Sequence, residues 1–410
     1  MEPTALGLPA SVGPIEVRRT HLSEVFLTAD RVYKVKRAVN LGFVDFTDRA
    51  ARLRACEAEV ALNRRLAPDV YLGLHTLPDG EPAVVMRRLD DADAMLAHLE
   101  RGALDVDTVR RVARRIAAFH AAAETGPEIA GYGRFDVVRQ NALDNFDQSA
   151  EAVGVAVSAV VHARARAATE RALDGAADAI EARAGSGRVR DTHGDLRLEH
   201  VYLPDGEVVV IDCIEFADRF RYADVAADIG FLTMDLEVRS RRDLADVAFD
   251  AWADAARDPG ARALRPLYTS YRSAVRAKVA GMTLADPTAS ADRRASQLAR
   301  ARRHWMLAWS AVEDPARRPV LVGIGGLPGT GKSTVARGLG DAGFAVVRSD
   351  VVRKEALGIA PTARAADAAY TDDARDAVYD RCFDRAAGLL FAGERVVIDA
   401  SFTADRWRAG

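Results

Sequence analysis

The spacing of hydrophobic and polar residues changes along this chain and divides it into regions. In the first ninety residues the pattern is mostly that of strands: residues 25–36 predict two strands around a short turn, and residues 82–87 predict another. A helical period over residues 47–66 ends before Pro68. We therefore expect a small sheet with one helix at the N-terminal end.

From about residue 90 the apolar spacing becomes helical. Residues 106–123 give the clearest amphipathic pattern, and the Ala-rich residues 163–183 are typical of a weakly amphipathic helix at the surface. Short strands and loops return over residues 192–216, and helical patterns resume over residues 224–312. We expect a mainly helical lobe that encloses one segment of strands and loops.

A third region follows a segment rich in proline and charge. Residues 313–319 hold two prolines and four charged residues, which indicates a linker. After it, short apolar runs alternate with helical patterns, an order that predicts a parallel sheet covered by helices. The predicted organisation is residues 1–89 and 90–312 as the two lobes of one domain, residues 313–319 as a linker, and residues 320–410 as a second domain.

Composition limits the classes of protein to consider. Hydrophobic residues make up 49% and charged residues 29% of the chain, as in globular proteins. The net charge is −3, and residues 320–410 carry no excess of basic residues, which argues against nucleic acid as a partner. No apolar run is long enough for a membrane span, and no secretory signal is visible. Three scattered cysteines, Cys56, Cys213 and Cys382, favour a reducing cytoplasm.

Residues 326–333 read Gly-Leu-Pro-Gly-Thr-Gly-Lys-Ser and match the Walker A pattern G-x-x-x-x-G-K-[ST] at every position. A strand-like run precedes them and a helical pattern follows. In such a P-loop, backbone N–H groups surround the phosphates of ATP or GTP, the lysine reaches the β- and γ-phosphates, and the hydroxyl holds Mg²⁺. The candidate nucleotide-binding residues are Gly326, Gly329, Thr330, Gly331, Lys332, Ser333 and Thr334.

A second signature of phosphoryl transfer lies upstream, in the run His193-Gly-Asp195. His200 follows Asp195 by five positions, and a strand-like run ends at Asp212. This order is that of a kinase catalytic core, in which Asp195 would orient the attacking hydroxyl, Asp212 would bind Mg²⁺ and His193 would brace the loop. Two further acidic residues are expected to cap helices or act as structural partners: Asp224 and Asp228.

These residues resemble the aminoglycoside phosphotransferase and choline kinase family, whose pattern is H-G-D-x-x-x-x-N followed by a strand and I-D. His200 departs from that pattern, in which asparagine stands at this position. The departure matters because imidazole is a poorer ligand than an amide oxygen for Mg²⁺. The resemblance implies that His200 is a metal ligand, that Lys34 binds phosphate and that Glu59 pairs with it. Lys36 shares a strand face with Lys34 and stays an alternative.

The C-terminal region resembles the small P-loop kinases, including gluconate, shikimate and adenylyl-sulfate kinases. That resemblance implies Asp350 as the base that activates an acceptor hydroxyl, Arg353 as a substrate clamp, and Asp399 as a metal ligand beside Ser333. The alternative for Asp350 is the N-cap of the next helix. Compared with those kinases, the region is expected to be truncated, without a clear lid.

The whole chain resembles bacterial proteins that join an aminoglycoside phosphotransferase-like kinase to a P-loop kinase-like ATPase. The resemblance implies an α+β, bilobal, protein-kinase-like domain followed by an α/β P-loop NTPase domain with a parallel sheet. We interpret the chain as a cytoplasmic, ATP- and Mg²⁺-dependent phosphotransferase with an alcohol group as acceptor. The predicted partner is a small hydroxyl compound that the sequence does not specify. We expect neither nucleic acid nor a membrane as a partner. The alternative is a nucleotide-sensing regulatory ATPase whose kinase-like domain is a binding scaffold.

Overall fold

The computed structural model describes residues 6–7, 15–42, 44–284, 289–327, 329–360, 362–363 and 366–407. Its contacts divide the chain into two compact units. Unit 1 comprises Met1–Asn141 and Leu173–Arg272, and unit 2 comprises Ala142–Ala172 and Ser273–Gly410. The linker and domain boundaries suggested by the residue pattern stay predictions.

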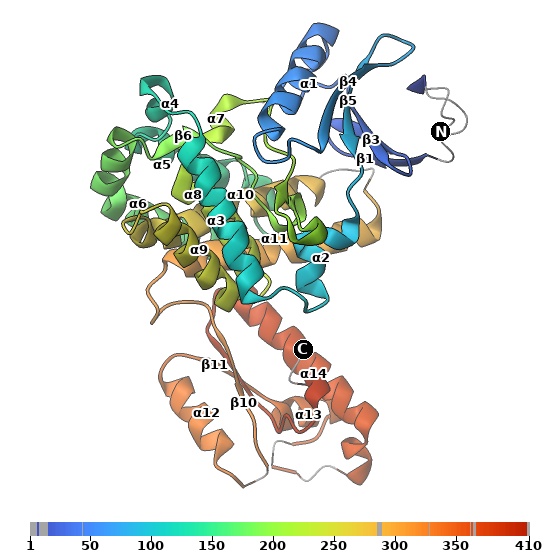
Figure 1. The fold of residues 1–410 in the computed structure, drawn as a ribbon. Coiled ribbons are helices and arrows are strands. Elements are labelled where there is room, and N and C mark those ends of the chain that lie inside the picture. Colours follow the sequence, from blue (N-terminus) through green and yellow to red (C-terminus); the bar gives the residue numbers. More distant parts are fainter. Residues whose placement is uncertain are drawn as a thin grey trace. The chain divides into compact units, whose positions relative to one another are not determined.

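Unit 1 begins with an antiparallel sheet of five strands in the order β1-β2-β3-β5-β4 (Figure 1). The helix α1 (Arg49–Asn63) packs on β4 and β5, and the carboxylate of Asp48 caps its first turn by accepting the N–H of Ala51. The predicted mostly-β region with one helix is thus confirmed. The strands are β1 (Glu16–Arg19), β2 (Ser23–Leu27), β3 (Arg31–Lys36), β4 (Tyr71–Thr76) and β5 (Pro82–Arg87).

Helices form most of the chain that follows. The boundaries between the two units fall inside α5, α6 and α10. Within the described residues, none of the helices has the length and apolar character needed to cross a bilayer. The helices are α2 (Met95–Glu100), α3 (Val106–Ala122), α4 (Pro127–Gly131), α5 (Phe135–Asp147), α6 (Ala159–Gly185), α7 (Asp218–Arg221), α8 (Val225–Glu237), α9 (Arg242–Ala255), α10 (Ala261–Leu284) and α11 (Ala291–Val312).

Two of these helices show how burial follows the residue pattern. The stripe of α3 that contains Val109, Val112 and Ile116 is fully buried, as its amphipathic pattern predicts, and α3 packs against α9. The helix α6 has the surface position that its pattern predicts, with exposed residues that include Asp174 and Asp178, but it also buries a face that includes Ala165 and Ala168. Alanine gives a weak hydrophobic signal but packs closely, so the pattern underestimated this buried face.

Short paired strands hold the loops of unit 1 that contain His193, Asp195 and Asp212. The strand β6 (Val189–Asp191) pairs with β9 (Tyr222–Asp224), and β7 (Val201–Tyr202) pairs with β8 (Val209–Val210). A 3₁₀ turn, η5 (Leu198–His200), connects the His193 loop to β7. Both loops are therefore tethered at their two ends by backbone pairing.

The C-terminal part of unit 2 is a parallel sheet in the order β10-β12-β11. The helix α12 lies on one side of the sheet, and α13 and α14 lie on the other (Figure 1). The predicted α/β arrangement is confirmed. The elements are β10 (Leu321–Ile324), α12 (Lys332–Asp341), β11 (Ala345–Arg348), α13 (Ser349–Leu357), α14 (Asp372–Phe391) and β12 (Val396–Asp399).

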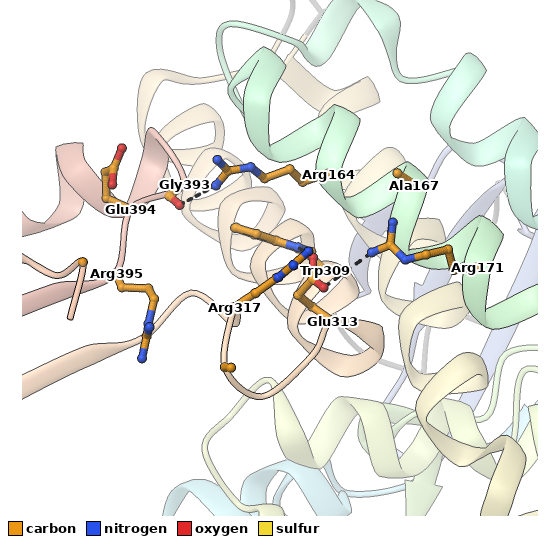
Figure 2. Close-up of a pocket in the computed structure, with 11 residues that line it drawn as sticks. Arg164, Ala167, Arg171, Trp309, Glu313, Arg317, Gly393, Glu394 and Arg395 are labelled. Carbon is orange, nitrogen blue, oxygen red and sulfur yellow. Dashed lines mark hydrogen bonds and ion pairs between the residues drawn. The ribbon is translucent and has the colours of Figure 1, made fainter.

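Unit 2 also contains a cavity of about 460 Å³, lined by residues of α6, the end of α11 and the segments before β11 and β12 (Figure 2). Several of its polar groups bind one another. Arg164 donates to the carbonyl oxygen of Gly393 at 2.9 Å, and Arg171 pairs with Glu313 at 3.4 Å. Trp309 Nε1 donates to Glu313 at 2.9 Å. The cavity lies near the amino ends of β11 and β12, whereas nucleotide sites in such sheets lie at the carboxyl ends.

A buried arginine provides a test of the packing in unit 1. Arg183 on α6 is 8% exposed and donates to Asp224 and to Asp258, the latter at 2.8 Å. Arg183→Ala removes the cation that both buried carboxylates share and, among the described residues, leaves only Arg188, 3.6 Å from Asp258, so we expect a loss of about 3–5 kcal/mol in the free energy of unfolding. Urea unfolding followed by circular dichroism measures it. The exposed pair of Arg139 and Asp174, 3.9 Å apart, gives the control Arg139→Ala, for which a loss of more than about 1 kcal/mol is not expected.

Candidate active sites

The centre of the first site is a cluster of buried charges in unit 1. Side chains alternate along β3, so Lys34 and Lys36 point to the same face of the sheet, where α1 presents Glu59. Lys34 Nζ lies 2.9 Å from Glu59 Oε1 and 2.8 Å from Asp212 Oδ1. Lys36 Nζ lies 2.6 Å from Glu59 Oε2 and also contacts Glu215. Both lysines thus share one glutamate.

The two lysines differ in their access to solvent. The side chain of Lys36 is 1% exposed and enclosed by Glu59 and Glu215, whereas that of Lys34 is 17% exposed and reaches Asp212. Of the two candidates, Lys34 is therefore the one positioned to meet a ligand at Asp212. Lys36 instead offsets part of the negative charge of the cluster.

Burial and charge act in opposite directions on this cluster. Burial by itself lowers the pKa of Lys34, but the charges of Asp212 and Glu59 outweigh it and hold the pKa well above its ordinary value. Burial by itself raises the pKa of Asp212, and the charge of Lys34 reverses this to a lowered pKa. Lys34 is therefore a cation and Asp212 an anion at neutral pH.

Three side chains near the end of α1 and on β4 position the Asp212 loop. The hydroxyl of Tyr71 accepts the backbone N–H of Asp212 at 3.2 Å, and Asn63 Oδ1 accepts that of Cys213 at 2.9 Å. Arg65 Nη2 donates to Cys213 Sγ at 3.3 Å, and its Nη1 donates to the carbonyl oxygen of Asp191, at the end of β6, at 2.9 Å. Asp212 itself has a φ of 63°, in the left-handed region that aspartate tolerates better than most residues. Sequence reasoning missed these positioning residues.

The loop that contains Asp195 is braced by its own histidine. His193 Nε2 donates to the carbonyl oxygen of Ile211 at 2.9 Å, and its Nδ1 accepts the backbone N–H of Asp195 at 3.3 Å, which corresponds to a neutral ring. This is the bracing arrangement that we expected. Gly194 has a φ of 83°, and a Cβ there would lie 2.8 Å from the carbonyl oxygen of Phe220, so the position requires glycine.

The helix α8 holds the same loop through two buried aspartates that accept hydrogen bonds from its backbone. Asp228 accepts the backbone N–H groups of His193 at 3.1 Å and Gly194 at 2.9 Å, and Asp235 accepts that of Leu198 at 3.1 Å. The two aspartates lie two helical turns apart and therefore share a face of α8. Acidic residues inside an otherwise apolar, buried helix are the signal that could have revealed this role.

Asp228 is in turn held by a chain of buried hydrogen bonds. Its Oδ2 lies 3.0 Å from His120 Nε2, and His120 Nδ1 accepts the N–H of Trp252 at 2.9 Å. Burial by itself would raise the pKa of Asp228, but the hydrogen bond from His120 holds it well below its ordinary value. The expectation that Asp224 and Asp228 are caps or structural partners is confirmed, since Asp224 caps α8.

His200 and Arg197 occupy the space between Asp195 and Asp212. His200 Nδ1 donates to the carbonyl oxygen of Asp195 at 2.8 Å, and its Nε2 accepts from Arg197 Nη2 at 2.9 Å. His200 Nε2 also lies 3.9 Å from Asp212 Oδ2. Arg197 Nε also donates to Asp195 Oδ1 at 2.9 Å. Burial lowers the pKa of His200 to about 4, so the ring is neutral at pH 7.

The contacts of Asp212 and His200 decide which of the two could bind Mg²⁺. Asp212 offers a carboxylate that is 39% exposed and anionic, which suits Mg²⁺. Both ring nitrogens of His200 are already engaged in hydrogen bonds. Among the residues that the structure describes, no three His, Cys, Asp or Glu side chains form a ready-made metal cluster. Asp212 therefore fits a magnesium ligand, and His200 does not fit one in this arrangement.

The second site is the P-loop of unit 2, at the carboxyl ends of β10 and β12. Ser333 Oγ donates to Asp399 Oδ2 at 2.7 Å, so the structure brings together the two expected metal ligands. Lys332 Nζ donates to the carbonyl oxygen of Leu327 at 2.7 Å. Pro328 lies outside the described residues. The glycines of the loop have positive φ values, 147° at Gly326, 81° at Gly329 and 86° at Gly331. Thr330 precedes α12, and Thr334 lies in its first turn.

The expected acceptor residues of the second site form ion pairs. Asp350 lies in the first turn of α13, 2.8 Å from Lys354 Nζ and 3.7 Å from Arg353 Nη1. It does not cap the helix, whose N-cap is Arg348. Arg348, which sequence reasoning missed, donates to Ser333 Oγ at 3.3 Å and lies 3.4 Å from Asp399.

Similar proteins are known both for the C-terminal region and for nearly the whole chain. A family described as an AAA domain matches residues 321–410. Uncharacterized proteins of Mycobacterium tuberculosis and Mycobacterium bovis are 33% identical to the chain over 407 residues, which is 96% of this chain and 80% of theirs. The family match at residues 321–410 agrees with the P-loop part predicted from the sequence, and the choline kinase-like part stays a prediction.

Solved structures similar to the chain include a choline/ethanolamine kinase family protein from Mesorhizobium loti, at 15% identity and a TM-score of 0.44, covering 75% of this chain and 96% of that one. An amicoumacin kinase in complex with AMP-PNP and Ca²⁺ gives 11% identity and a TM-score of 0.45, covering 71% and 87%. Choline kinase from Streptococcus pneumoniae gives 14% and 0.42, covering 72% and 95%.

Asp228→Asn tests whether α8 fixes the loop. Asparagine keeps the shape but turns one acceptor oxygen into a donor, so one of the N–H groups of His193 and Gly194, or His120, loses its partner. Because a hydrogen bond to a charged group is worth about 1.5–3 kcal/mol, amide hydrogen exchange in this loop should accelerate roughly 10- to 100-fold. Exchange measured by mass spectrometry checks this. Asp243→Asn, at an exposed ion pair, is the control, and equal exchange in the two variants would rule out the anchoring role.

Proposed function

We propose that this chain, which belongs to the same family as the mycobacterial proteins, is a phosphotransferase that uses ATP and Mg²⁺. It would move the γ-phosphate of ATP to the hydroxyl group of a small molecule at the site around Asp195, and it would bind a second nucleotide at the P-loop. The observation that carries the proposal is the position of Lys34, whose ammonium group lies 2.9 Å from Glu59 and 2.8 Å from Asp212.

Transfer of a phosphoryl group requires positioning and charge neutralisation more than covalent chemistry from the protein. Lys34, oriented by Glu59, would contact the phosphates, and Asp212 would hold Mg²⁺, which neutralises the phosphate charge. Asp195 would orient the acceptor hydroxyl. The acceptor oxygen forms a bond to the γ-phosphorus, the bond from that phosphorus to the bridging oxygen breaks, and ADP leaves. The hydroxyl proton passes to Asp195 and then to solvent.

The P-loop would use the same elements in another arrangement. The loop glycines and Lys332 would surround the phosphates, and Ser333 and Asp399, which are 2.7 Å apart, would hold Mg²⁺. Arg348 adds a positive charge beside this pair. We also propose a cytoplasmic location, where ATP and Mg²⁺ are available, and no role for nucleic acid or membranes.

A second candidate function for the P-loop follows from its acceptor residues. Asp350, the expected base, is paired with Lys354 and Arg353, so a hydroxyl acceptor would have to displace these ion pairs. A nucleotide-sensing role for the P-loop is therefore the second candidate, although Asp195, the expected base of the first site, is itself paired with Arg197 at 2.9 Å. Asp350 and Arg353 stay the candidate base and clamp if the P-loop does transfer phosphate.

Measurement of ATP consumption with a panel of sugars, amino alcohols and aminoglycosides tests the proposal. An acceptor should stimulate turnover in the wild type, and Asp195→Ala should reduce the stimulated rate about 10²- to 10⁴-fold. Lys332→Ala should leave most of that rate intact, because it alters only the P-loop. Asp243→Ala, at an exposed residue, is the matched control.

The opposite pattern of activity in these two variants would assign phosphoryl transfer to the P-loop. If Lys332→Ala abolishes the stimulated turnover and Asp195→Ala does not, transfer occurs at the P-loop. If ATP binds tightly and no acceptor raises turnover in any variant, the chain is not a small-molecule kinase, and a regulatory role takes its place.

A further inference from the structure

Arg197, on the same loop, explains why a histidine stands at position 200 in place of the asparagine of the kinase pattern. In the family pattern an asparagine stands at this position, whereas His200 here uses Nδ1 to donate to the carbonyl oxygen of Asp195 and Nε2 to accept from Arg197. A metal ion cannot take the Nε2 lone pair unless Arg197 leaves. The residues present therefore do not fit a second metal ion at this point, and what they hold instead is a guanidinium group.

Arg197 is fixed on three sides. Its Nε lies 2.9 Å from Asp195 Oδ1, its Nη2 lies 2.9 Å from His200 Nε2, and its Nη1 contacts Glu199. The side chain is only 10% exposed. These contacts use three of the five N–H groups of a guanidinium, which leaves two to donate elsewhere. An arginine with free N–H groups in a rigid plane is the side chain best suited to bind two phosphate oxygens at once.

The position of this cation matches the place of the phosphates in the proposed reaction. The same His200 nitrogen that accepts from Arg197 is 3.9 Å from Asp212 Oδ2, so the guanidinium lies close to both the expected magnesium ligand and the expected base. Lys34 pairs with Asp212 from the sheet side. One protein cation, Lys34 from β3, therefore contacts Asp212, and another, Arg197 from the loop, contacts Asp195, with His200 between the guanidinium and Asp212.

We propose that Arg197 takes the place of the second metal ion of a kinase catalytic site, so that the site around Asp195 works with one Mg²⁺, held by Asp212. The inference rests on the proposed function. Arg197 neutralises the γ-phosphate, and His200 keeps the guanidinium in position by accepting one of its N–H groups. Histidine thus replaces asparagine because its task is to orient an arginine and not to bind a metal.

Counting bound metal ions tests this inference without reference to activity. Mn²⁺, which is visible by electron paramagnetic resonance, is titrated into the full chain carrying Lys332→Ala, with saturating AMP-PNP, and bound nucleotide is measured in parallel. We expect one Mn²⁺ per bound AMP-PNP. Two Mn²⁺ per nucleotide would overturn the proposal. If the Lys332→Ala chain binds no nucleotide, the proposed function itself fails.

Variants of Arg197 provide the second measurement. Arg197→Ala should weaken the binding of AMP-PNP about tenfold more than that of ADP, because ADP lacks the γ-phosphate. Arg241→Ala, at an exposed arginine paired with Asp243, should leave both affinities unchanged. Arg197→Ala combined with His200→Asn should bind a second Mn²⁺. An unchanged AMP-PNP to ADP ratio in Arg197→Ala would contradict the proposal, and this result does not depend on the folding of the double variant.

Discussion

The carboxylate of Glu59 neutralises two lysines that the alternation of β3 directs to one face of the sheet. Charges taken out of water cost several kcal/mol each unless they are paired, so Lys34, Lys36, Glu59, Asp212 and Glu215 are stable only together. Because these residues come from β3, α1 and the segment after β8, the cluster requires all three elements to be in place at once. The same requirement fixes the distance between Lys34 and Asp212, on which the proposed chemistry depends.

The opposite side of the site is fixed by α8. Asp228 and Asp235 bind the backbone of the loop at His193, Gly194 and Leu198, on either side of Asp195. Asp195 therefore lies on a loop whose backbone is hydrogen-bonded to α8 on both sides of it. Arg197 and His200 belong to that fixed segment, which is why a guanidinium there can take over a task that in other sites falls to a metal ion.

The residue pattern predicts features that lie within one stretch of the sequence and misses those that depend on contacts between distant segments. The P-loop is a contiguous motif, and Asp399 follows from the rule that parallel strands end at one edge of a sheet, so this site was predictable. Lys34, Glu59, Asp195 and Asp212 were predicted from the order in which the resembling kinase family has them along the chain. The roles of Tyr71, Arg65 and Arg348 depend on approaches between distant segments, which no local pattern encodes.

The number of nucleotides that the full chain binds is the most direct test of the two-site account. Equilibrium dialysis with AMP-PNP and Mg²⁺ should give two nucleotides per chain, with one lost in Lys332→Ala and the other in Lys34→Ala. A single nucleotide per chain that disappears in Lys332→Ala and persists in Lys34→Ala would contradict the account, because the cluster around Lys34 would then be structural and the P-loop would be the only working site.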